Sequence, residues 1–99
     1  MLYAIIARDV ANSIVLRPAA RSRHLQYVQT LADEGRVIFA GPHPAIDSPD
    51  PGPAGFDGSL IIAEFDSLEN AQAWSAGDPY AIEGIFAEVI VKPLLQVLP

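Results

Sequence analysis

The sequence predicts an α+β fold in which strands and helices follow one another in the order β-α-β-β-α-β. This prediction rests on apolar runs of strand length that flank two segments of helical periodicity. The chain has 99 residues, the length of one ordinary domain, so we expect a single domain over residues 1–99. Hydrophobic residues make up 51% of the chain, and so high a fraction in a short chain calls for a structural explanation.

The first half of the chain predicts a strand followed by a long helix. Residues 2–7 (LYAIIA) are continuously apolar and too few for a helix, so we expect a strand that is covered on both faces. Residues 17–34 have helical periodicity, with Pro18 suited to the first turn and Gly35 suited to the position after the last. The predicted buried stripe of this helix consists of Ala20, His24, Val28 and Leu31.

A second strand and a proline-rich segment follow. Residues 36–40 (RVIFA) predict the strand, which Gly41 and Pro42 end. The segment 41–58 is longer than most connections in a compact domain and has prolines at positions 42, 44, 49, 51 and 53. Because proline stiffens the backbone, we expect an ordered arm within the domain and not a flexible linker.

The second half repeats the order of strand, helix and strand. Residues 59–65 (SLIIAEF) predict the third strand, and Asp66 and Glu69 have the spacing of a capping box that begins a helix. After this helix, Asp78-Pro79 predicts a further short helical turn, because Asp caps helices and Pro fits their first position. Residues 85–91 (IFAEVIV) predict the fourth strand, which Lys92-Pro93 ends before an apolar tail.

This order is that of the ferredoxin-like arrangement. Right-handed crossovers place both helices on one face of a four-stranded antiparallel sheet and leave the other face bare. Residues 2–6 and 60–62 nevertheless offer apolar side chains to both faces. A large bare apolar face is an interface or an aggregation hazard, so we expect a second copy to cover it in a homodimer. The alternative is a monomer whose C-terminal tail folds over that face.

Composition excludes several classes of function. Twelve acidic and six basic residues give a net charge of -6, which argues against nucleic-acid and anionic membrane partners. The chain has no cysteine, which excludes disulfides, Cys-ligated zinc and a thiolate nucleophile. No residue spacing matches a metal motif or a phosphate loop, so no metal or cofactor is expected. The apolar runs are strand-sized and the N-terminus lacks signal-peptide features, so we expect a cytoplasmic protein.

Two side chains are candidates for catalysis. His24 is either a core histidine or a group that exchanges protons near neutral pH. Asp78 is either only a helix cap or also a carboxylate that orients an imidazole, and its two oxygens allow both roles. The candidates for binding a ligand are Arg21, Ser59 and Tyr80. Arg17 and Arg23 are expected at the solvated edge of the first helix.

Several segments, in their order and spacing, resemble the YciI-like (YCII-related) family. They are residues 2–5 (LYAI), 21–25 (RSRHL), Gly35, 40–42 (AGP), 58–59 (GS), 65–69 (FDSLE), Trp74 and 78–80 (DPY). The resemblance implies a ferredoxin-like dimeric α/β barrel and a pocket with a His–Asp pair, which maps onto His24 and Asp78. Family members similar to those in chlorinated-aromatic breakdown are linked to dehydrochlorination of a hydroxylated chloro-aromatic.

Together these observations predict a small cofactor-independent enzyme that uses general acid–base catalysis for an elimination or isomerisation. His24 would move the proton, and Asp78 would orient the imidazole and stabilise its charged form. The expected substrate is a small, partly apolar metabolite with an acidic C–H or O–H. One alternative is a non-catalytic dimer that binds a small ligand, and another is a structural module in which His24 and Asp78 only satisfy each other.

Overall fold

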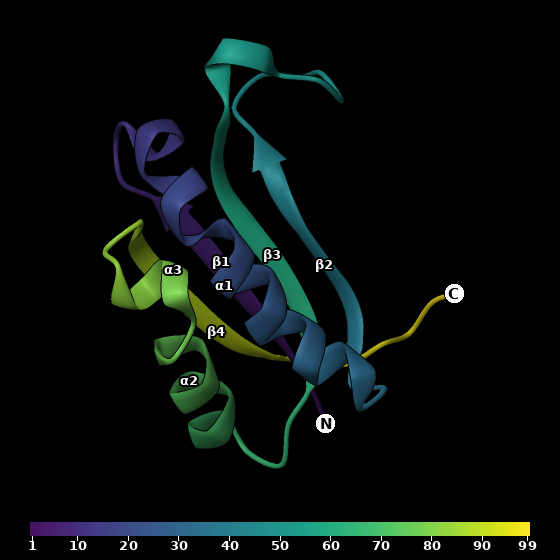
Figure 1. The fold of residues 1–99 in the computed structure, drawn as a ribbon. Coiled ribbons are helices and arrows are strands. Elements are labelled where there is room, and N and C mark those ends of the chain that lie inside the picture. Colours follow the sequence, from purple (N-terminus) through teal and green to yellow (C-terminus); the bar gives the residue numbers. More distant parts are fainter.

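A four-stranded antiparallel sheet forms the centre of the molecule, with three α-helices on one of its faces (Figure 1). The computed structural model describes all 99 residues. The strand order is β2-β3-β1-β4, so the predicted ferredoxin-like arrangement is confirmed. The strands are β1 (Leu2–Asp9), β2 (Val37–Pro44), β3 (Phe56–Glu64) and β4 (Phe86–Leu94). No helix combines the length and the apolar character that crossing a membrane requires.

Helix α1 (Ser13–Asp33) begins about one turn earlier than the sequence predicts. Ser13 is buried, and its hydroxyl donates to the Phe56 carbonyl at 3.1 Å, which fixes this first turn to β3. Pro18 therefore lies inside the helix and not in its first turn. Three residues of the predicted stripe are buried: Val28 and Leu31 pack in the main core against the sheet, and Ala20 packs with Tyr80 and Ile85.

Helix α2 (Leu68–Ala76) and helix α3 (Pro79–Ile82) follow β3. The predicted capping box from Asp66 is wrong. Ser67 occupies the cap position, where its hydroxyl oxygen accepts from the Asn70 N–H at 3.0 Å. Asp78 caps α3 as predicted, with its carboxylate accepting from the Tyr80 N–H.

The predicted bounds of the proline-rich arm, residues 41–58, are wrong at both ends. β2 continues to Pro44 and β3 starts at Phe56, so only residues 45–55 connect the two strands, including a 3₁₀ turn at Gly52–Ala54. β4 likewise continues through Pro93, where the sequence predicts its end. β2 and β4 are the two edge strands, and an edge strand accommodates proline because its outer N–H groups have no partner strand.

The two faces of the sheet differ in what covers them. On the helix side, Tyr3 and Ile5 of β1 and Ile61 of β3 are buried in the core. Side chains alternate along a strand, so Ile6 points to the opposite face, where it lies between Leu60 of β3 and Ile90 of β4.

No segment of the chain covers this opposite face. Ile6 and Ile90 are 37% and 39% exposed, and Phe39 on β2 is 51% exposed. The C-terminal tail leaves β4 as an extended segment (Figure 1), and its Leu95 and Leu98 are about as exposed as free side chains. The tail therefore does not pack over the open face in the single chain.

Candidate active site

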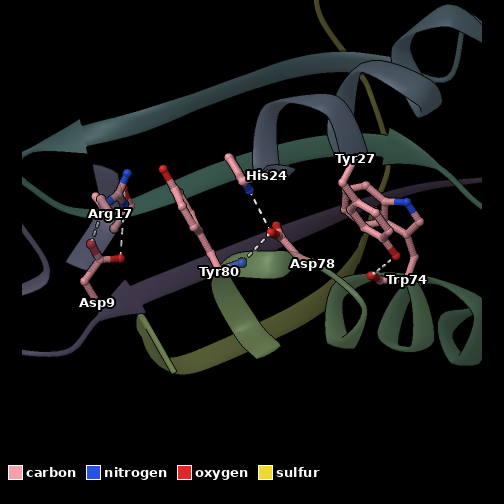
Figure 2. A network of polar contacts seen from close by, with 8 residues as sticks. Asp9, Arg17, His24, Tyr27, Trp74, Asp78 and Tyr80 are labelled. Carbon is pink, nitrogen blue, oxygen red and sulfur yellow. Dashed lines mark hydrogen bonds and ion pairs between the residues drawn. The ribbon is translucent and has the colours of Figure 1, made fainter. Parts of the chain in front are cut away.

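His24 and Asp78 are brought together from distant parts of the sequence (Figure 2). His24 lies in the middle of α1, and Asp78 is the cap residue of α3. The distance between His24 Nδ1 and Asp78 Oδ1 is 2.7 Å. The Asp78 side chain is 2% exposed and that of His24 is 12% exposed, so this hydrogen bond is largely shielded from water.

Asp78 acts on the imidazole and on the backbone of α3 at the same time. Its Oδ1 atom contacts His24 Nδ1 and also accepts from the Tyr80 N–H at 2.9 Å. The sequence allowed these roles to use separate oxygens, but the structure uses a single oxygen for both. The helix cap thereby fixes the carboxylate at the position where it holds the imidazole.

This contact determines where a neutral His24 carries its proton. An ionised carboxylate can only accept hydrogen bonds, so the proton of the neutral ring lies on Nδ1. The other nitrogen, Nε2, then has a free lone pair. It makes no hydrogen bond within the protein, and His24 lines a cavity of about 150 Å³. A neutral His24 in this arrangement has the chemistry of a proton acceptor.

Tyr80 forms a wall of the same cavity and supports the imidazole. Its ring is parallel to the His24 ring, with 3.9 Å between the centroids and 5° between the planes. Figure 2 shows Tyr80 between His24 and Arg17. Burial raises the pKa of Tyr80, although the nearby charges of Arg17 and Arg21 act in the opposite direction. Its hydroxyl therefore keeps its proton near neutral pH and can serve as a hydrogen-bond donor.

Arg17 belongs to this site, and the prediction that it lies at a solvated edge is wrong. Its Nε and Nη2 atoms contact the two carboxylate oxygens of Asp9 at 2.7 and 3.1 Å, and Nη2 also donates to the Gly58 carbonyl. The guanidinium lies 5.0 Å from the centroid of the Tyr80 ring. Because α1 begins at Ser13, Arg17 falls in its second turn and faces the sheet.

The remaining predicted ligand residues line the same cavity as His24. Ser59 is buried on β3, and Arg21 lies one turn before His24 on α1. A second cavity, of about 290 Å³, adjoins the first and shares with it Arg17, Arg21, Pro42 and Tyr80. The structure thus collects His24, Arg21, Ser59 and Tyr80 around one space, while Asp78 lies behind the imidazole.

Tyr27 fixes α2 against α1 close to Asp78. Its hydroxyl donates to the Trp74 carbonyl at 2.7 Å, and the two rings stack with their centroids 4.9 Å apart. Gly77 is required beside it, since an added Cβ would lie 2.6 Å from the Tyr27 hydroxyl oxygen. Burial and, to a smaller degree, the Asp78 charge raise the pKa of Tyr27. This contact holds the segment that leads into the α3 cap.

The groups available at the site suit proton transfer and anion binding. They are an imidazole, two guanidinium groups and two hydroxyls, together with apolar walls. No three His, Asp or Glu side chains converge in a way that would hold a metal ion.

The chain as a whole is similar to several known proteins. The family model of the YCII-related domain matches residues 1–95. Protein YciI of Escherichia coli and protein YciI of Shigella flexneri are each 55% identical over 97 residues, covering 98% of this chain and 99% of the relative. An uncharacterized protein of Haemophilus influenzae is 46% identical over the same length.

A solved structure from Burkholderia phenoliruptrix shares the fold. It is 5-chloro-2-hydroxyhydroquinone dehydrochlorinase in complex with 2,5-dihydroxybenzoquinone. The TM-score is 0.86 and the sequence identity is 25%, over 97% of this chain and 95% of the other. The similarity thus extends over nearly the whole of both chains.

Proposed function

This chain belongs to the YCII-related domain family, and we propose that it is a small enzyme that moves a proton on a small, partly apolar molecule. The reaction is an elimination or an isomerisation by general acid–base catalysis, and it uses only side chains of the protein. His24 is the group that takes and returns the proton. Asp78 orients the imidazole and stabilises the imidazolium that forms.

The observation that carries this proposal is that His24 lines a cavity and has its Nδ1 held by a buried carboxylate at 2.7 Å, which leaves Nε2 without a partner in the protein. In the proposed step, Nε2 takes a proton from a C–H or O–H of the substrate, and the negative charge of Asp78 balances the imidazolium. In an isomerisation the proton returns at another atom. In an elimination the electron pair of the broken C–H bond forms a double bond as an anion leaves. The similarity to a dehydrochlorinase supports this class of reaction.

A proton-exchange assay tests the proposal. The probe is 2,5-dihydroxybenzoquinone in heavy water, and proton NMR follows the replacement of its ring hydrogens by deuterium. The imidazolium of His24, deuterated at Nε2 by the solvent, delivers deuterium to a ring carbon, and the neutral imidazole that results removes the hydrogen from the same carbon. We expect the natural chain to accelerate this exchange, and the His24→Gln variant to lose about two to four orders of magnitude of that acceleration.

The second histidine of the chain provides the matched control. His43 lies on the edge strand β2, is exposed and lines neither cavity of the site. We expect a His43→Gln variant to exchange the probe at the rate of the natural chain. Equal rates in the His24→Gln variant and the natural chain would contradict the catalytic role. Saturable binding of the probe without any acceleration would instead favour the alternative of a non-catalytic ligand-binding protein.

We also propose that the protein is a homodimer in which a second copy covers the open face of the sheet. The exposure of Ile6, Phe39 and Ile90 on this face supports the proposal, as does a tail that leaves the face uncovered. An Ile6→Glu substitution places a charge at the centre of the face without touching the helices. We expect light scattering to give the mass of a dimer for the natural chain and of a monomer for the variant. A monomeric natural chain would contradict the proposal.

The proposal also covers the domain organisation, the cellular location and the partners of the protein. Residues 1–99 act as one domain, which the family match over residues 1–95 supports. We expect the protein to work in the cytoplasm, consistent with a chain that has no cysteine. Its net charge of -6 argues against nucleic acid and anionic membranes as partners.

A further inference from the structure

One cationic side chain at the two cavities has no ion-pair partner, although the chain as a whole is acidic. Arg17 is paired with Asp9 at 2.7 Å, and His24 is paired with Asp78 at the same distance. Arg21 lines both cavities but makes no hydrogen bond or ion pair. No Asp or Glu lines either cavity. The guanidinium of Arg21 is therefore the one charged group lining the cavities that has no ion-pair partner.

We propose that the second cavity is an anion subsite, where Arg21, Arg17 and Tyr80 bind the negatively charged oxygen atoms of a monoanionic, ring-sized ligand. This inference rests on the proposed function, because it takes the ligand to be the molecule whose proton His24 moves. It adds to that function the charge and the orientation of the substrate. A ligand with one negative charge balances the unpaired Arg21 without disturbing either buried pair.

The spacing along α1 sets the geometry of such a ligand. Arg17, Arg21 and His24 are separated by four and three residues, so they lie on one face of the helix. At 1.5 Å per residue, Arg21 and Arg17 lie roughly 5 and 10 Å before His24 along the helix axis. A molecule that presents an acidic C–H or O–H to Nε2 thus has its charged group within about 10 Å of that atom. This is the scale of one substituted ring.

The size and lining of the cavities agree with this class of ligand. The first cavity, of about 150 Å³, has the volume of a cavity known in another protein to bind benzene. Val28, Ile61 and Leu25 supply apolar wall there. The second cavity is larger, does not include His24, and is lined by Arg17 and Arg21, which also line the first. The ring therefore fits beside His24 with its charged group toward the second cavity.

The three residues of the subsite contribute in different ways. Arg17 is held in place by Asp9, by the Gly58 carbonyl and by the Tyr80 ring, so it offers a fixed donor direction. Arg21 is exposed and unpaired, so it can move onto the ligand and supplies the net attraction. The Tyr80 hydroxyl remains protonated at neutral pH and donates to the same oxygens.

A pair of probes that differ only in charge tests this inference. Benzoate and its neutral analogue benzamide are titrated into the natural chain, and the dissociation constants are measured by calorimetry. We expect benzoate to bind about tenfold more tightly than benzamide. In an Arg21→Gln variant we expect this preference to disappear through weaker benzoate binding, with benzamide binding unchanged. Added salt should also reduce the preference, since Arg21 is exposed.

Arg23 on the same helix is the matched control. It is exposed and paired with Glu83, and it lines neither cavity, so Arg23→Gln changes the net charge equally but away from the site. The preference of the Arg23→Gln variant for benzoate over benzamide should equal that of the natural chain. Equal binding of the two probes to the natural chain, no binding of benzoate up to its solubility, or an equal effect of both substitutions would each overturn the inference. Because the titration needs no turnover, loss of the anion preference and loss of proton exchange are separate results.

Discussion

An Asp9→Asn substitution should lower the free energy of unfolding by about 3 kcal/mol relative to the natural chain. The Asp9 side chain is 1% exposed and that of Arg17 is 11% exposed, so removing the carboxylate charge leaves a largely buried guanidinium without its partner. The expected loss is at the lower end of the range for such cases, because Arg17 keeps its hydrogen bond to Gly58 and lies beside a cavity. Urea denaturation of both proteins measures the difference.

The surface pair of Arg23 and Glu83 is the control for this prediction. Its nitrogen–oxygen distance of 2.6 Å is close to that of the Asp9–Arg17 pair, but both side chains are about half exposed. A Glu83→Gln substitution should therefore change the free energy of unfolding by less than about 1 kcal/mol. An Asp9→Asn effect no larger than this would mean that the buried pair does not fix Arg17 in the site.

Replacing Asp78 by asparagine should reduce the rate of probe exchange by about two to four orders of magnitude while leaving the protein folded. Asparagine caps helices about as well as aspartate, so the Tyr80 N–H keeps its acceptor and α3 keeps its start. The uncharged amide, however, no longer stabilises the imidazolium of His24. The substitution thus separates the capping role of Asp78 from its role toward the imidazole.

Two measurements on the Asp78→Asn variant decide between the interpretations of this residue. The exchange rate reports the role toward His24, and the thermal unfolding midpoint reports the cap. An unchanged exchange rate would contradict the proposed role of the carboxylate. A large fall in the midpoint would favour the structural interpretation, in which His24 and Asp78 mainly stabilise the fold.

The order of the elements could be predicted because the period of apolar residues changes clearly along the chain. The continuous run of residues 2–7 and the helical stripe through Ala20 and Val28 are local patterns, and both are found in the structure. The ends of β2 and β4 could not be predicted in the same way. A proline usually ends a strand, and whether it is accommodated depends on which strands form the sheet edges.

The residues alone made His24 a candidate proton-exchanging group and Asp78 a candidate carboxylate, but their pairing was implied by the resemblance to the YCII-related family. The structure joins them at 2.7 Å. Arg17 was missed because the predicted helix start placed it at the first turn. Its partner Asp9 lies at the end of β1, and only the folded sheet brings the two together. The spacing of Arg17, Arg21 and His24 on one helical face was the signal that could have found it.

The most direct test of the account is nitrogen-15 NMR of the imidazole rings. The chain has two histidines, so the His43→Gln variant assigns the signals of His24. We predict that neutral His24 carries its proton on Nδ1, that its unprotonated nitrogen is Nε2, and that benzoate shifts the Nε2 signal. A proton on Nε2, or an Nε2 signal that does not respond to a ligand bound in the cavity, would contradict the claim that His24 presents its proton acceptor to the substrate.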